Sequence, residues 1–240
     1  MDILEEAKSL KNNAKATKEI ADTKNDPESY DEALEDLKEA RGLLMAELSA
    51  IERKPSSITE LLNKRRQEIA LELADCFGIT GGIYRRKGDI GEAIKMYEKG
   101  YEYEKNPDYN IQDSYNMTNR IVLRILNEPH LVEQLMPKIE EALSIIQKQV
   151  EGPRRRQWWA RADLGLLYIL TKDEKRGLDA YREFKDYGAL PKHYDSSIAV
   201  LIELKGRLEK VDQTIYSSIE KAINFLKEEK SAIEKQTKLS

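Results

Sequence analysis

The chain carries one spaced pattern of small and aromatic residues twice, and the second copy lies 84 positions after the first. The first copy reads Gly81-x2-Tyr84-x8-Ala93-x3-Tyr97-x2-Gly100-x6-Pro107. The second copy reads Gly165-x2-Tyr168-x8-Gly177-x3-Tyr181-x2-Phe184-x6-Pro191. A pattern that returns in register is typical of stacked supersecondary units. We therefore expect the small residues to let two helices approach closely and the tyrosines to fill the space between successive helices.

The hydrophobic pattern predicts helices throughout. Apolar residues recur at three- and four-residue spacing in a chain that is 40% hydrophobic and 35% charged, with only 12 Gly and 7 Pro in 240 residues. The expected helices are 2–22, 28–51, 57–87, 90–105, 111–127, 130–151, 154–171, 174–187, 194–209 and 213–236. Because no run alternates as a buried strand does, the predicted fold class is all-α.

Two sites carry helix-start signals, and one proline falls inside a periodic run. Asp26-Pro27 and Ser57-x-x-Glu60 offer side-chain oxygens that can cap free backbone N–H groups. Pro137 lies inside an otherwise helical run, so we expect a kink or a new helix start there.

Composition excludes several classes of function. One cysteine, Cys76, rules out an internal disulfide framework, and the two histidines, His130 and His193, are too few and too far apart for a zinc site. A net charge of −4 makes nucleic-acid binding unlikely, since neutralising phosphates needs a basic excess. No signal peptide or membrane span is expected, so the predicted location is cytoplasmic.

Catalytic chemistry finds no support in the sequence. Cys76 lies on an apolar helix face and is expected to be a buried structural thiol. The 44 carboxylates alternate with basic residues as they do on solvated faces, and no phosphate-binding loop follows a strand. We predict a protein that is not an enzyme and has no cofactor.

The repeated pattern resembles the tetratricopeptide repeat, which has the same order of small and aromatic positions. The resemblance implies a right-handed α-solenoid of about five helical hairpins forming a single domain over residues 1–240. The best repeats are 73–107 and 157–191, and the irregular helices at 1–51 and 194–236 would cap the ends. Such solenoids bind peptides, folded proteins or small ligands on their curved faces, so the fold alone does not define a function.

A longer stretch, residues 73–126, is similar to the tetratricopeptide-like regulatory region of apoptosis signal-regulating kinases and bacterial conflict-system proteins. The similarity rests on Phe77–Arg86, Ala93–Gly100, Asp108-Tyr109 and Ser114–Arg120. It implies a sensor or scaffold in stress or defence signalling that detects a nucleotide-like ligand and acts on an effector domain. No effector is present in these 240 residues, which suggests either an excised module or a protein whose effector is encoded separately.

Four polar residues of one predicted helix form the first candidate binding group. Asn116, Arg120 and Arg124 share a face, and Asn119 borders the same side. Amides beside arginines can orient a carboxylate or a phosphate. In the structural alternative, the asparagines link adjacent helices and the arginines pair with Asp113 or Glu128.

A glycine-rich segment forms the second candidate. Gly78 and Gly82 are four residues apart and would leave a helix face bare, with Arg85 and Arg86 one turn further along. Such a floor could hold a planar or anionic group. The alternative is that each glycine allows close packing against the next helix.

The third candidate combines arginine with tryptophan in the segment 154–161. We expect Arg155, Arg156 and Trp159 to contact a ligand, because this pair of residue types suits both stacking on a base and binding an acidic peptide. In the alternative, one tryptophan fills the core between repeats and the arginines are solvated at a helix start.

Three functions remain open on the sequence. The first is a sensor of a nucleotide-like or other anionic small ligand, bound between the predicted third and seventh helices and relayed through protein contacts. The second is an adaptor that binds an acidic peptide segment of a protein partner. The third is an architectural subunit that self-associates through its end helices.

Overall fold

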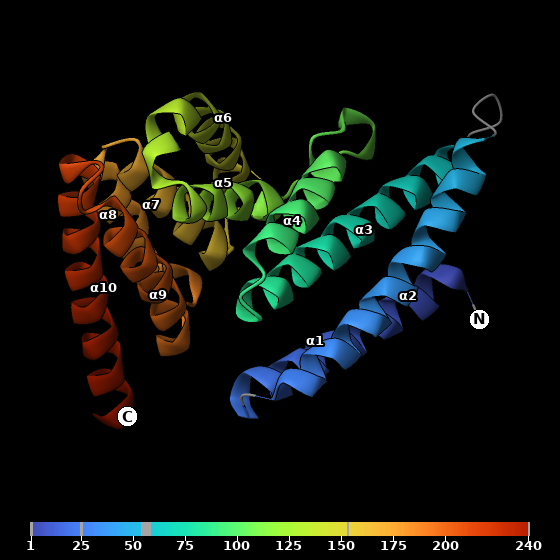
Figure 1. The fold of residues 1–240 in the computed structure, drawn as a ribbon, viewed down its shortest axis with the longest axis horizontal. Coiled ribbons are helices and arrows are strands. Elements are labelled where there is room, and N and C mark those ends of the chain that lie inside the picture. Colours follow the sequence, from blue (N-terminus) through green and yellow to red (C-terminus); the bar gives the residue numbers. More distant parts are fainter. Residues whose placement is uncertain (1, 25, 54–58, 153, 240) are drawn as a thin grey trace. The chain divides into compact units, whose positions relative to one another are not determined.

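The computed structural model describes residues 2–24, 26–53, 59–152 and 154–239, with side chains up to residue 235 (Figure 1). Within these ranges the chain forms ten α-helices and no strands, which confirms the predicted all-α class. The helices are α1 (Ile3–Lys24), α2 (Pro27–Glu52), α3 (Glu60–Arg86), α4 (Ile90–Glu104), α5 (Tyr115–Asn127), α6 (Val132–Glu151), α7 (Trp158–Leu170), α8 (Glu174–Arg182), α9 (Pro191–Leu208) and α10 (Gln213–Leu239). None of the helices in the described ranges is long and apolar enough to cross a membrane.

The chain divides into two compact units, Met1–Arg120 and Ile121–Ser240. The single solenoid expected over residues 1–240 stays a prediction.

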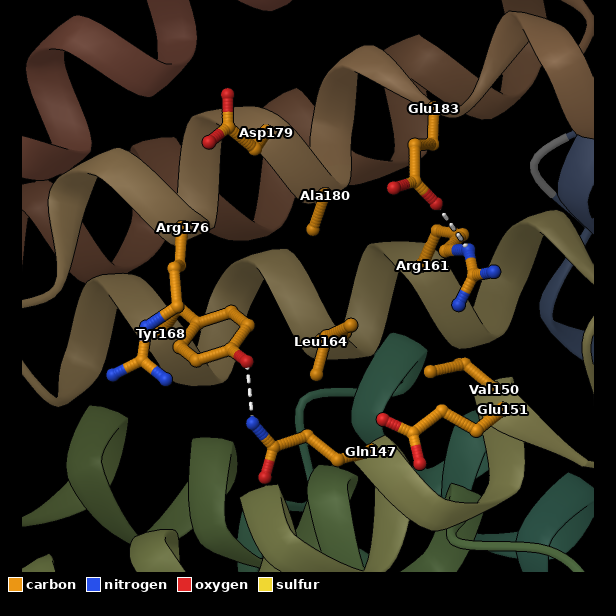
Figure 2. A pocket seen from close by; sticks show the side chains of 10 residues that line it. All are labelled: Gln147, Val150, Glu151, Arg161, Leu164, Tyr168, Arg176, Asp179, Ala180 and Glu183. Atoms are coloured by element: carbon orange, nitrogen blue, oxygen red, sulfur yellow. Dashed lines mark hydrogen bonds and ion pairs between the residues drawn. The ribbon is translucent and has the colours of Figure 1, made fainter.

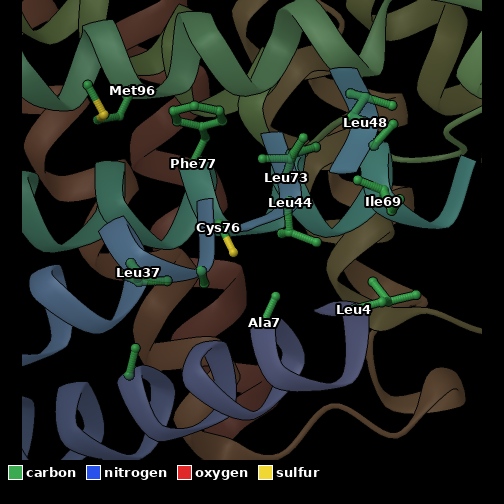
Figure 3. Packing of buried hydrophobic residues seen from close by; sticks show 14 of the residues in the cluster. Leu4, Ala7, Leu37, Leu44, Leu48, Ile69, Leu73, Cys76, Phe77 and Met96 are labelled. Carbon is green, nitrogen blue, oxygen red and sulfur yellow. The ribbon is translucent and has the colours of Figure 1, made fainter. Parts of the chain in front are cut away.

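The first unit is built from two helical hairpins, α1 with α2 and α3 with α4, with α3 also packed on α2. Asp26 caps α2 as predicted: its Oδ1 accepts a hydrogen bond from the Glu28 N–H at 3.1 Å, and Pro27 occupies the first helical turn. Leucines and alanines of α1, α2 and α3 interdigitate in the core, and Phe77 of α3 lies beside Met96 of α4 (Figure 3). Cys76 is fully buried in this core, as predicted.

One charged cluster lies where α1 packs on α3. Lys11 is only 8% exposed, and its ammonium forms ion pairs with Glu72 and with Asp75, the latter at 2.7 Å. Lys15 also pairs with Asp75, at 3.1 Å. Buried charges need such partners because removal from water is costly.

The second unit contains the contacts of α6 with α7, α7 with α8, and α9 with α10, and α10 also packs on α7 and α8. Its core includes a cluster of aromatic rings. Phe184 lies 5.4 Å, centroid to centroid, from both Tyr181 and Tyr194, with the rings arranged edge to face. All three side chains are fully buried.

The two copies of the repeat make the same contact. A Cβ atom added at Gly81 would lie 3.0 Å from the Tyr97 ring, and one added at Gly165 would lie 2.8 Å from the Tyr181 ring. Each tyrosine comes from the helix that follows its glycine. The repeat thus corresponds to one interlocking of two helices, α3 with α4 and α7 with α8, and glycine is needed because the ring occupies the place of a side chain.

Helix α5 begins later than predicted. The prediction was 111–127, but the helix starts at Tyr115 because the Asp113 carboxylate accepts hydrogen bonds from the backbone N–H groups of Ser114 and Tyr115, at 2.7 and 3.0 Å. Helix α8 ends at Arg182 rather than at 187. A 3₁₀ turn (η4, Lys185–Tyr187) follows it, and Gly188 then adopts a left-handed conformation with φ of 80°.

One proline and one capping signal remain to be compared with the prediction. Of the two outcomes expected at Pro137, the new helix start is wrong, since α6 runs through this residue after a short 3₁₀ turn (η3, Pro129–Leu131), and the kink stays a prediction. Ser57 lies outside the described residues. In its place, the Thr59 hydroxyl accepts from the Leu62 N–H at 3.3 Å and caps α3.

Candidate functional site

Asn116 lies at the start of α5 and joins three helices of the first unit. Its side-chain amide nitrogen donates to the Ala74 carbonyl oxygen of α3 at 3.0 Å and to Oε1 of Glu104 of α4 at 2.7 Å. The Glu104 carboxylate also accepts from the backbone N–H groups of Asn116 and Met117, at 2.9 and 3.1 Å. The residue is buried, so the geometry matches the structural alternative, in which asparagine links adjacent helices.

The other polar residues of this helix have local partners. Asn119 donates from its amide to the Tyr115 carbonyl oxygen at 2.9 Å. The guanidinium of Arg120 lies 4.2 Å from the centroid of the Tyr101 ring, a close cation–π contact. Arg124 is partly buried, lies in the second unit and also has a partner. A ligand role for these three residues stays a prediction.

Of the two glycines predicted to leave a bare helix face, Gly78 and Gly82, one packs against another side chain of the protein. A Cβ atom at Gly78 would lie 2.9 Å from the Tyr115 ring, so this glycine serves close helix packing. Gly82 is less crowded, with Tyr97 and Arg86 atoms at 3.6 Å from the same test position. Arg86 forms an ion pair with Asp22 at 2.7 Å, and Arg85 also has a partner.

The arginine-rich segment lies before α7 rather than in its first turn. The prediction began this helix at 154, but it starts at Trp158. Arg154 is only 2% exposed, and its guanidinium donates to the side-chain oxygens of Gln149 at 2.8 Å and Gln157 at 2.7 Å. This bridge holds the turn between α6 and α7.

Arg155 and Arg156 behave differently from Arg154. Both are exposed, and neither has an acidic partner among the residues that the structure describes. Their neighbour Trp159 is 42% exposed. These are the three residues that the sequence analysis selected from the segment.

The adjoining rings extend this face to α9. Trp158 stacks on His193 with centroids 3.9 Å apart, and Trp159 lies edge-on against Trp158 at 5.8 Å. His193 accepts at Nδ1 from the Leu190 backbone N–H at 2.9 Å, which holds the start of α9 beside the stack. Leu190 is 53% exposed. We name the set Arg155, Arg156, Trp159 and Leu190 the basic–aromatic surface.

A cavity of about 320 Å³ lies along α7 in the same unit (Figure 2). Side chains of α6, α7 and α8 surround it, with Val150, Leu164 and Ala180 forming its apolar part. Gln147 reaches across from α6 and donates to the Tyr168 hydroxyl at 2.5 Å.

The charged groups of the cavity are largely paired with one another. Arg161 forms an ion pair with Glu183 at 2.8 Å, which Figure 2 shows on the right. Arg176 pairs with Asp173 at 2.5 Å and lies over the Tyr168 ring at 4.7 Å. Both guanidiniums therefore have internal partners, and the cavity is a weaker anion site than the exposed arginines nearby.

Sequence reasoning missed Leu190 and the cavity. Leu190 directly precedes Pro191, where the sequence suggests only a helix boundary, and nothing in its neighbourhood indicates an exposed apolar side chain. A ligand bound between the predicted third and seventh helices would contact Arg120 on one side and Trp159 with an arginine of the segment 154–156 on the other. These residues belong to different units, so that arrangement stays a prediction.

Comparison with known proteins returns little. No protein-family model matches the chain, and no curated relative matches it. Among solved structures, the chain is similar to the crystal structure of BtubC (BKLC) from P. vanneervenii, with 15% sequence identity over 98% of this chain and 93% of that chain and a TM-score of 0.39. The function of this chain is therefore inferred from its own residues.

Proposed function

We propose that this chain is a non-enzymatic helical-repeat adaptor that binds an acidic segment of a partner protein at the basic–aromatic surface. One observation carries the proposal: Arg155 and Arg156 are exposed without an acidic partner among the described residues, beside a half-exposed tryptophan. Arginine and tryptophan are the residue types most enriched at the energetic centres of protein interfaces.

The geometry of the surface supports a preorganised site. Trp158 is held between His193 and Phe184, with centroid distances of 3.9 and 6.2 Å, and Trp159 rests on Trp158. A side chain that is already positioned loses less conformational entropy on binding. Leu190 adds an exposed apolar contact, so we expect the bound segment to combine carboxylates with at least one large apolar residue.

The hypothesis of a nucleotide-like ligand has less support. Of the residues proposed for it, Asn116 is bonded to Glu104, Arg86 is paired with Asp22, and Arg120 lies over Tyr101. The first two contacts occupy groups that an anion would need, and the third holds the Arg120 guanidinium against a ring. Stress or defence signalling, which the family resemblance implied, remains a proposal that depends on the identity of the partner.

Selection from a random peptide library on the purified chain tests the proposal. We expect enrichment of peptides with Asp or Glu next to a large apolar residue. The double variant Arg155→Gln/Arg156→Gln should weaken binding of a selected peptide about tenfold, since each exposed charge pair contributes up to about 1 kcal/mol. Arg207→Gln is the matched control, because Arg207 is also exposed and has no acidic partner in the described chain.

Two results would contradict the proposal. One is selection of peptides without acidic residues. The other is equal binding by the double variant and the wild type, which would show that the selected peptides bind elsewhere. Far-ultraviolet circular dichroism of each variant separates a binding defect from unfolding.

A further inference from the structure

Arg41 of α2 is a half-buried arginine without a carboxylate partner in the part of the chain that the structure describes. Its Nη1 donates to the Thr80 hydroxyl, and its guanidinium carbon lies 5.2 Å from the centroid of the Phe77 ring. Burial lowers the pKa of Arg41, and the titratable groups that act on it are the Cys76 thiol and the Tyr84 phenol. Burial raises the pKa of the Cys76 thiol to about 12, so this group is neutral at pH 7.

Arg65 shows how the same unit treats another half-buried arginine. Its guanidinium pairs with Asp2 at 2.5 Å and with Glu47 at 2.8 Å. Removing a charge from water without a partner is costly, and proteins normally supply a carboxylate as they do for Arg65. The two arginines differ in that no carboxylate of the described chain offsets the charge of Arg41.

Thr80 does not explain why Arg41 is present. The Thr80 hydroxyl donates to the Cys76 carbonyl oxygen at 2.8 Å, so its own donor is satisfied within α3. Arg41 has five N–H groups, of which one bonds Thr80. Its remaining donors and its charge are therefore free to bind an acceptor.

A second cation lies at the same ring. The Lys99 ammonium of α4 is 6.0 Å from the Phe77 centroid, and Lys99 is exposed with no acidic partner among the described residues. Phe77 also stacks on Tyr103 at 5.9 Å, which in turn stacks on Tyr109. The Glu52 carboxylate accepts a hydrogen bond from the Tyr109 hydroxyl at 2.7 Å. Tyr103 lies between Tyr109 and Phe77 in this row of rings, so Glu52 contacts the end of the row away from Phe77.

We propose that Arg41 and Lys99, which reach the Phe77 ring from α2 and α4, form an anion-binding site of the Met1–Arg120 unit that takes a carboxylate or phosphate group. The guanidinium supplies parallel N–H donors that match either group, and the ammonium adds a second positive charge. The aromatic row provides an apolar border on which the organic part of a ligand can rest. This site and the basic–aromatic surface are in different units, so each proposal can fail without the other.

Thermal unfolding in matched salts tests the site. The probes are sodium phosphate and sodium acetate, each compared with sodium chloride at equal ionic strength, with the midpoint followed by circular dichroism. We expect the wild-type midpoint to rise with phosphate or acetate beyond the rise in chloride, because a ligand that binds only the folded state stabilises it. The probe that gives the larger rise identifies the group.

Substitutions at two arginines make the test specific. Arg41→Met should keep or raise the midpoint in chloride, since it removes an uncompensated charge, and should lose the response to the probe. Arg65→Met should lower the midpoint, because it leaves Glu47 and Asp2 without their partner, but should keep the response. Arg41→Gln removes the charge while keeping a donor for Thr80, and should lose the response in the same way.

The proposal is overturned by either of two results. If Arg41→Met lowers the midpoint as Arg65→Met does, Arg41 is a structural residue. If phosphate and acetate shift the wild type and both Arg41 variants equally, the effect is a general action of the salt on protein stability. For Lys99→Met we expect a smaller rise of the unfolding midpoint with phosphate or acetate, and an unchanged midpoint in chloride.

Discussion

The Glu104 carboxylate holds the first turn of α5 through Asn116, because its Oε1 accepts from both the backbone N–H and the side-chain amide of that residue, at 2.9 and 2.7 Å. The contact joins the end of one helix to the start of the next. Gly100 makes it possible: a Cβ atom at this position would lie 2.4 Å from the Asn116 side chain. A small residue of the repeat therefore makes room for a polar link between helices.

The same carboxylate predicts a pH dependence of stability. Burial raises the pKa of Glu104 from 4.5 to about 7, so the folded protein keeps a proton that the unfolded chain releases between these pH values. The free energy of unfolding should fall by about 1 to 3 kcal/mol as the pH rises through this range. Urea unfolding at pH 5 and pH 8 measures the fall, and Glu104→Gln should remove that share of it.

The matched control for this prediction is Glu102→Gln on the same helix. Glu102 is exposed and pairs with Lys105 at 2.7 Å, so its removal should leave the pH dependence as in the wild type. An unchanged pH dependence in Glu104→Gln would show that this carboxyl group titrates normally.

Glycine at the repeat contact should resist replacement. Gly165→Ala should lower the free energy of unfolding by about 1 to 3 kcal/mol, because the new methyl group would overlap the buried Tyr181 ring. Gly42→Ala is the control: Gly42 lies within α2, and a Cβ atom there meets nothing within 4 Å. That change should stabilise the protein by about 0.5 to 1 kcal/mol through helix propensity. Urea unfolding of both variants measures the two changes in unfolding free energy. Equal changes would contradict the close packing of the Tyr181 ring on Gly165.

The buried ion cluster between α1 and α3 gives a third prediction. Lys11→Met leaves Glu72 without its cation and Asp75 with only Lys15, and should cost about 3 kcal/mol of unfolding free energy. Lys8→Met, which breaks the exposed pair with Glu5, should change stability by less than about 1 kcal/mol. Similar losses in the two variants by urea unfolding would mean that burial of the cluster has no energetic consequence.

The two tryptophans should differ in their effects. Trp158→Ala removes a ring that packs against His193 and Phe184 and should lower the free energy of unfolding by about 3 kcal/mol. Trp159→Ala should change stability by less than about 1 kcal/mol but weaken binding of a selected acidic peptide about tenfold or more. Unfolding and binding measurements on both variants separate the roles, and a Trp159→Ala variant that binds normally would remove this residue from the surface.

Helix positions were predictable because the hydrophobic periodicity that marks a helix recurs along the sequence. Hydrophobic periodicity defined the helices, and Asp26-Pro27 fixed the start of α2. The errors came where a local side-chain hydrogen bond decides the structure of a turn. The turn before α7 depends on Arg154 reaching Gln149 and Gln157, and such a bridge cannot be inferred from residue spacing.

The candidate sites were less predictable than the helices. Exposure separates Arg155 and Arg156 from Arg154, yet the three are consecutive and identical in type. Arg41 went unnoticed because a lone arginine in an amphipathic helix resembles any other solvated residue. Its significance depends on the absence of a carboxylate partner among the described residues, which only the packing of α2 on α3 reveals.

The placement of Cys76 and the tryptophans gives the protein two built-in reporters. The chain has one cysteine, which is buried in the Met1–Arg120 unit, where burial raises the pKa of its thiol to about 12. It should react with a thiol reagent only when that unit opens. Both tryptophans lie in α7, so their fluorescence follows the Ile121–Ser240 unit. Comparing thiol labelling with fluorescence along one denaturation series would show whether the two units unfold together or in sequence, without any introduced label.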